Sequence, residues 1–66
     1  MTDITAAEKL FEAKREVGYR ERVYARLVAE GKMKAANAAR GIAVMKAIAA
    51  DYAALAEAET AKTRLL

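Results

Sequence analysis

One short break, Gly31-Lys-Met-Lys34, divides this 66-residue chain into two stretches that each carry a helical pattern. Neither stretch contains proline, the residue that most strongly breaks helices. Eighteen residues are alanine, which has the highest helix propensity of all residues. The sequence therefore predicts an all-α fold in which residues 1–66 form a single domain, an antiparallel two-helix hairpin.

The first helix is predicted at about residues 6–30. Thr5 and Glu8 have the spacing of a capping box, in which a hydroxyl and a carboxylate each accept a backbone N–H at the helix start. Gly31 is expected to end the helix, because glycine readily adopts the left-handed backbone conformation that follows a last turn. Residues three and four apart form one apolar stripe along this helix: Ala6, Leu10, Ala13, Val17, Tyr24, Leu27 and Val28.

The second helix is predicted at about residues 35–62, after a turn at about 31–34. Its start is poorly marked, because Lys34 stands where a capping Ser, Thr, Asp or Asn is usual. A turn this short makes the two helices antiparallel neighbours, and it places Tyr24 opposite Gly41. The apolar seam of the second helix has steps of four and three residues, with Ile48 and Leu55 at its edge: Ala38, Ile42, Met45, Ala49, Tyr52 and Ala56.

A lone hairpin of this sequence buries little apolar surface, because much of each stripe is alanine. The second helix also has alanines that repeat every seven residues, which suits a helix with two neighbours. We therefore expect a homodimer that forms a four-helix bundle; the alternative is a marginal monomer in which alanine serves helix propensity alone. The candidates for self-association are Leu10, Val17, Tyr24, Val28, Ile42, Met45, Ala49 and Tyr52, with the alanines Ala36, Ala43, Ala50, Ala47 and Ala54.

Charge is unevenly distributed along the chain, whose net charge is +3. Residues 20–46 contain seven basic and two acidic side chains, a net +5, so the remaining residues carry −2. The hairpin tip is thus basic. The candidates for binding a partner are Arg15, Tyr19, Arg22 and Arg26 on the outer side of the first helix, and Lys32, Met33 and Lys34 at the tip. Phosphate binding with a base stacked on Tyr19 is one interpretation of this pattern, and an ordinary solvated face is the other.

Glu21 lies at the edge of the first apolar stripe and needs a partner there. Lys46 or Arg40 on the facing helix can supply one. The alternative interpretation is a catalytic carboxylate with a raised pKa, but a structural ion pair is the favoured reading.

The chain lacks several of the residue types that most often carry out catalysis or bind metals. Histidine, cysteine and serine are absent, which removes the imidazole base, the thiolate, the serine nucleophile and the ordinary zinc site. We expect no catalytic residue, no cofactor and no metal site. No apolar run approaches the roughly 18 residues of a membrane span, and no signal peptide is recognisable, so the cytoplasm is the expected location.

Residues 20–52 contain Val-Tyr at 23–24, Gly-Lys-Met at 31–33 and Asp-Tyr at 51–52, with Ile42, Met45 and Ile48 spaced three apart between the last two motifs. With these motifs the segment resembles a group of short proteins encoded in phages and prophages. The chain departs from the group at Ala25, where proline is common, and at Lys34, where a polar capping residue is common. The resemblance implies a phage origin and a bacterial host cell, with no established activity. The matching positions are Arg22, Val23, Tyr24, Gly31, Lys32, Met33, Ile42, Met45, Ile48, Asp51 and Tyr52.

The function expected from these features is that of a non-enzymatic phage accessory protein that binds another protein. An inhibitor or modulator of a host factor, of the anti-defence or anti-regulator type, fits its size and origin by analogy. Two alternatives remain open: a small basic protein that binds nucleic acid, and a structural or assembly adaptor of the phage.

Overall fold

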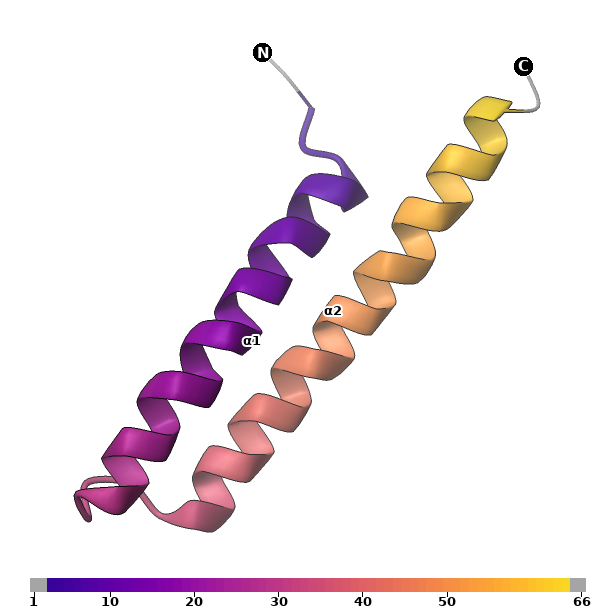
Figure 1. The fold of residues 1–66 in the computed structure, drawn as a ribbon. Coiled ribbons are helices and arrows are strands. Elements are labelled where there is room, and N and C mark those ends of the chain that lie inside the picture. The colour runs from indigo at the N-terminus through magenta and orange to yellow at the C-terminus, as the bar shows by residue number, and fades with distance from the viewer. Residues whose placement is uncertain (1–2, 65–66) are drawn as a thin grey trace.

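Two antiparallel helices make up the fold (Figure 1). The computed structural model describes residues 3–64, and the side chains of residues 3–62. Helix α1 spans Ala6–Ala29 and helix α2 spans Ala35–Arg64, with no strand in the described range. The predicted all-α hairpin is confirmed, although α1 ends one residue earlier and α2 two residues later than expected.

The start of α1 is closed by the predicted capping box. The backbone N–H of Glu8 donates to Thr5 Oγ1 at 3.1 Å, and the backbone N–H of Thr5 donates to Glu8 Oε1 at 3.2 Å. Two N–H groups are thereby satisfied, and the carboxylate lies near the positive end of the helix dipole. The helix start therefore follows directly from these two residues.

The end of α1 is a Schellman motif built on Gly31. Gly31 has φ +74°, the left-handed conformation expected for it. Its N–H donates to the carbonyl of Val28 at 3.0 Å, and the N–H of Lys32 donates to the carbonyl of Leu27 at 2.8 Å. These two bonds satisfy carbonyls of the last helical turn and redirect the chain toward α2.

The helices face each other through small residues. Ala6, Ala13 and Ala38 are the buried hydrophobic residues of the described chain, and no described side chain is completely buried. The rest of both predicted stripes is only half-buried: Leu10, Val17, Tyr24, Leu27 and Val28 on α1, and Ile42, Met45, Ala49, Tyr52 and Ala56 on α2. The stripes are therefore correctly placed, but one hairpin does not enclose them.

Arg20 ties the two helices together near the tip. Its Nη1 donates to the carbonyl of Gly41 at 2.8 Å, and its Nε donates to Glu16 Oε2 at 2.8 Å. The hydrogen bond that Arg20 donates to Glu16 raises the pKa of the Arg20 guanidinium above its ordinary value. A Cβ at Gly41 would lie 3.2 Å from Tyr24 Cε2, which confirms the predicted pairing of ring and glycine. The apolar pattern did not indicate that Arg20 faces α2.

The predicted partner of Glu21 is also observed. Lys46 Nζ lies 3.2 Å from Glu21 Oε2, and both side chains are about half exposed. This ion pair joins α1 to α2 on the side of the hairpin away from Arg15 and Tyr19. At such exposure it contributes little to stability, so it serves chiefly to favour one register of the helices.

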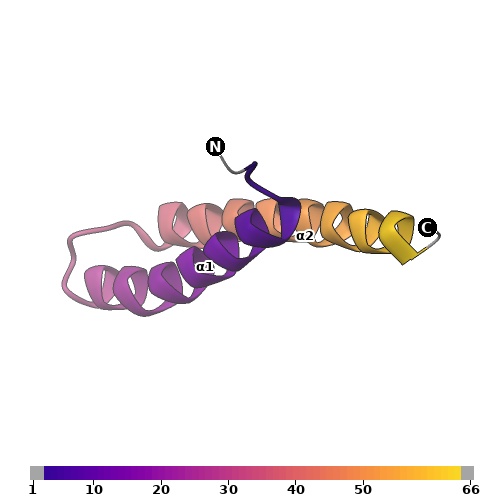
Figure 2. The ribbon, with the colours of Figure 1, turned by 90° about the horizontal axis from the view of Figure 1, so that it is seen from above.

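The hairpin is long and thin. Its extents are 53 × 23 × 14 Å, and its radius of gyration is 15.4 Å, against about 11 Å expected for a compact domain of this length. Helix α2 has 30 residues and α1 has 24, so the last turns of α2 project beyond the start of α1 (Figures 1 and 2). The molecule is a single layer of helices, whereas domains ordinarily consist of two packed layers.

Candidate interaction surface

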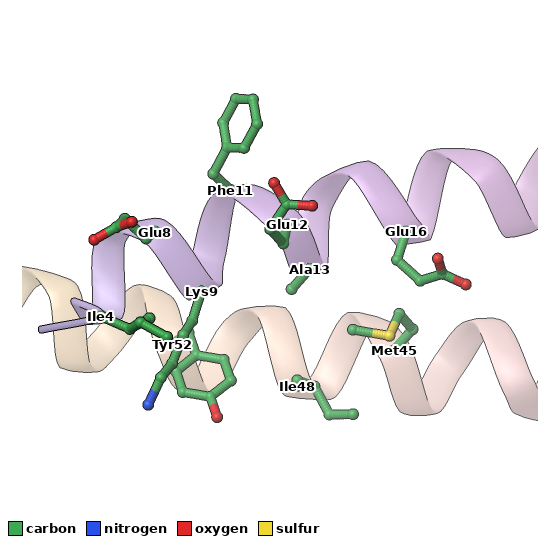
Figure 3. Close-up of a pocket in the computed structure, with 10 residues that line it drawn as sticks. All are labelled: Ile4, Glu8, Lys9, Phe11, Glu12, Ala13, Glu16, Met45, Ile48 and Tyr52. Carbon is green, nitrogen blue, oxygen red and sulfur yellow. The ribbon is translucent and has the colours of Figure 1, made fainter. Parts of the chain in front are cut away.

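An open groove of about 720 Å³ runs between the first half of α1 and the middle of α2 (Figure 3). Ala13, Met45 and Tyr52 form its floor, where the two helices meet. Phe11 points away from α2 at the outer edge of the groove. The complete lining is Ile4, Glu8, Lys9, Phe11, Glu12, Ala13, Glu16, Met45, Ile48 and Tyr52.

One rim of the groove is acidic. Glu8, Glu12 and Glu16 follow each other at intervals of four residues and therefore lie along one side of α1. Glu12 is bridged by Arg15 at 3.3 Å, an exposed pair, and Glu16 is held by Arg20. The carboxylates of this rim are thus available to a cation in part only, with Glu8 and Glu12 the more accessible.

A cation also lies over the groove floor. Lys9 Nζ is 5.4 Å from the centroid of the Tyr52 ring, a distance at which an ammonium is attracted by the ring face. Lys9 comes from α1 and Tyr52 from α2, so the contact joins the helices near their open end. Both residues line the groove.

The six exposed large hydrophobic side chains of the described residues lie along the groove or beside it, and Phe11 among them points away from α2 at the outer edge (Figure 3). Ile4, Phe11 and Ile48 line the groove, and the first two are 70% and 63% exposed. Tyr19 lines an adjoining hollow of about 270 Å³ that shares Glu12 and Glu16 with the groove. Val44 and Leu55 lie four residues before and seven after Ile48, so they share its side of α2. We call these six residues the groove face: Ile4, Phe11, Tyr19, Val44, Ile48 and Leu55.

The predicted partner-binding residues are distributed over two places. Arg15 and Tyr19 border the hollow beside the groove, and Arg22 and Arg26 continue along the exposed side of α1. Arg22 and Arg26 form no ion pair with any described residue. At the tip, Lys32 and Lys34 are exposed and Met33 is half-buried, with Lys32 Nζ 3.4 Å from Glu30 Oε1.

The predicted self-association residues also divide into two groups. The larger side chains lie half-buried where α1 meets α2, so they hold the hairpin itself together. The alanines of the seven-residue repeats are all exposed, on the side of α2 that faces away from α1: Ala36, Ala43, Ala47, Ala50 and Ala54. Between Gly41 and Ala56, only Lys46 and Asp51 are charged, so α2 is apolar on almost every side.

Sequence patterns selected only part of the groove face: Tyr19 as a candidate for binding a partner, and Ile48 and Leu55 at the edge of the second seam. Ile4 precedes the first helix, and Phe11 lies outside the apolar stripe of α1, so neither fits the main periodicity. A usable signal was present in α2, where Val44, Ile48 and Leu55 repeat at steps of four and seven beside the main seam. In the structure this second row is exposed.

No known protein family, curated protein or solved structure matches the chain. Within residues 3–64, no three acidic side chains are grouped as a metal site requires, and neither helix is long and apolar enough to cross a membrane. The groove face is accordingly the feature of the described residues from which a function can be argued.

Proposed function

We propose that the chain is a non-enzymatic protein-binding module that works as a homodimeric four-helix bundle. One observation carries the proposal: three alanines are buried while six large hydrophobic side chains are exposed along one groove and beside it. Contiguous apolar surface of this kind on a small protein typically marks an interaction site. A second hairpin laid on that face supplies the second layer that the single hairpin lacks.

The solvent-exposed area of the chain supports a second hairpin as the partner. The chain has a solvent-accessible surface of 5319 Å² at a mass of 7.2 kDa, whereas a compact folded monomer of that mass exposes about 4,100 Å². The excess is about 1,200 Å² by the same relation. A specific interface of ordinary size removes about 800 Å² from each partner, so a dimer interface can account for most of the excess.

The setting we propose is a bacterial cytoplasm, with the protein acting as a phage accessory factor on a host protein. The resemblance of residues 20–52 to short phage-encoded proteins supports this origin. The basic tip, with exposed Lys32 and Lys34, is available to an acidic surface on that host protein. Binding there would inhibit or modulate the host factor by occupying its surface, since the module brings no catalytic group of its own.

Affinity capture from a bacterial lysate tests this function. We expect the wild-type chain to recover a host protein reproducibly and the Lys34→Glu variant to lose it. Lys14→Glu is the matched control, because Lys14 is exposed on α1 away from the tip and the groove face. Loss of folding would not explain a defect of Lys34→Glu, because a carboxylate at the start of α2 favours that helix. Equal recovery by all three proteins, or recovery of nothing, would contradict the proposal.

Nucleic-acid binding is the rival function, and the net charge of +5 over residues 20–46 favours it. It has a distinct signature, because the affinity for a polyanion falls steeply as salt rises. A gel-shift titration at about 50 and about 200 mM salt distinguishes the two functions. Binding at the lower salt that vanishes at the higher salt would replace the protein partner with a nucleic acid.

A further inference from the structure

We infer that two copies of this chain pack groove face to groove face with their hairpins pointing in opposite directions, the basic tip of each against the open end of the other. The inference rests on the proposed homodimer and adds its surface and its orientation. The occupant of the groove is thus a second copy of the same chain.

Two-fold symmetry allows the groove faces to meet in only two ways. An axis parallel to the helices puts both tips at one end and lays α1 on α2 of the second copy. An axis perpendicular to the helices, lying between the two faces, puts the tips at opposite ends. In that case α1 packs antiparallel on α1 of the second copy, and α2 packs antiparallel on α2.

The charge distribution chooses between these arrangements. Residues 20–46 carry +5 and the rest of the chain −2, so the charge changes sign between the tip and the open end. Tips at one end would bring the two basic halves together without compensation, and like charges in an interface disfavour it. Tips at opposite ends bring each basic half against an acidic one.

The same complementarity appears at the level of single residues on α1. Glu8 and Glu12 lie in its first half, and Arg22 and Arg26 lie exposed in its second half. When α1 packs antiparallel on α1 of the second copy, the residue numbers of any two facing residues add up to the same value. A sum of about 34 places Glu8 near Arg26 of the second copy, and Glu12 near Arg22 of the second copy. Symmetry makes each pair twice. The same register places Arg15 beside Tyr19 of the second copy.

Helix α2 fits the matching register. Within one hairpin Tyr24 lies against Gly41, so the axis that passes near residue 17 of α1 passes near Ile48 of α2. Ile48 then meets Ile48 of the second copy, and Val44 meets Tyr52. Leu55 lies at the level of Gly41, where the Tyr24 ring of the second copy packs. The exposed apolar row of α2 is thereby covered by apolar or small residues.

This arrangement also assigns places to the two remaining features of the hairpin. The last turns of α2, which extend past the start of α1, lie against the beginning of α2 in the second copy. The two basic tips occupy opposite ends of the bundle. A dimer of this form presents two equivalent basic sites, so it can hold two acidic partner surfaces at once.

Distance measurement between labelled tips tests the orientation. The chain has no cysteine, so a Lys34→Cys variant carries one spin label per chain. Lys34 lies 14 residues from the axis at Ile48, so the two labels are expected about 42 Å apart at 1.5 Å per residue. Labels at Ala47→Cys, one residue from the axis and exposed on the side of α2 that faces away from α1, are the control and are expected within about 20 Å, the scale of two neighbouring helices. A distance below about 20 Å between the Lys34 labels of a dimer would overturn the orientation, leaving the homodimer intact.

Charge reversal tests the register independently of the labels. Glu12→Arg and Arg22→Glu are each expected to raise the dimer dissociation constant about tenfold, because each places like charges together twice. The double variant restores both pairs with opposite sense, and we expect it to return to near the wild-type value. Glu57→Arg is the control, since Glu57 is exposed on the side of α2 away from the groove. A double variant as weak as either single one would overturn this register, and a wild-type chain that stays monomeric would overturn the homodimer itself.

Discussion

Gly18 and Gly41 both interrupt helices, where glycine is less favourable than alanine by about 1 kcal/mol, yet their surroundings differ. A Cβ at Gly41 would lie 3.2 Å from Tyr24 Cε2, so the missing side chain makes room for the ring. A Cβ at Gly18 would meet only the flexible end of Arg22, 3.5 Å away. Gly41 thus has a packing reason that Gly18 lacks, and α1 runs without interruption through Gly18.

Gly18→Ala is therefore expected to raise the free energy of unfolding by about 0.5–1 kcal/mol, because the unfolded chain loses backbone freedom and nothing in the fold is displaced. Gly41→Ala is the matched comparison and is expected to gain less, since Tyr24 must shift. Urea titrations followed by circular dichroism measure both values. If Gly18→Ala were less stable than the wild type, the open space assigned to this position would be wrong.

The stability of the hairpin is also expected to depend on Arg20. Its guanidinium reaches Glu16 and the carbonyl of Gly41 at the same time, which a single ammonium of lysine does less well. We expect Arg20→Lys to lower the midpoint of thermal unfolding, and Arg15→Lys, whose one ion pair lies exposed within α1, to leave it nearly unchanged. Equal midpoints for the two variants would show that the bond to Gly41 does not hold the helices together.

At the scale of the elements, the sequence predicted those features of the helices that depend on residues close together in the chain. Thr5, Glu8 and Gly31 predicted both ends of α1, because each acts through hydrogen bonds of the backbone to residues only a few positions away. The position of Arg20 was not predictable from periodicity, since its bond to Gly41 spans 21 residues. The groove escaped prediction for the same reason: Phe11 and Ile48 share it only because the hairpin folds as it does.

The capping box at the start of α1 provides a direct test of such a local interaction. Thr5→Ala is expected to reduce the free energy of unfolding by about 1 kcal/mol, because it leaves a backbone N–H of α1 without its acceptor. Thr60→Ala is the control, since its hydroxyl only donates to Ala56 within α2 and contributes little there. Chemical denaturation of both variants measures the difference. A Thr60→Ala loss as large as that of Thr5→Ala would contradict the role given to the capping box.

The start of α2 offers the opposite test. It has no acidic residue in its first turn, and Lys34 precedes it. Lys34→Asp places an acceptor and a negative charge at this helix start, and we expect it to stabilise the fold by about 1 kcal/mol. The measurement is again the free energy of unfolding, and a loss of stability would contradict the assignment of residue 34 as the cap position.

At the scale of the whole molecule, the hairpin leaves large apolar side chains exposed. It is 14 Å thin, exposes 5319 Å², and encloses none of its described side chains completely. The alanine repeats of α2 predicted a second neighbour for this helix, and the exposed larger residues of the groove face, such as Phe11 and Leu55, support the proposed dimer further. In the proposed dimer, a second copy covers a face that is apolar at its centre and oppositely charged at its ends.

Substitution of Ile48 is expected to dissociate the proposed dimer. It lies at the centre of the groove face and is 37% exposed in the hairpin, so a carboxylate there remains hydrated in a monomer but becomes buried in a dimer. We expect Ile48→Glu to be monomeric at concentrations where the wild type is dimeric. Lys14→Glu, which changes charge on another face, should remain dimeric.

Sedimentation equilibrium of the unmodified chain over a micromolar concentration series tests the central claim most directly. The homodimer predicts a mass of about 14 kDa, twice the 7.2 kDa of the chain, with helical circular dichroism at the same concentrations. A folded, helical species that stays at 7.2 kDa across the series would contradict it.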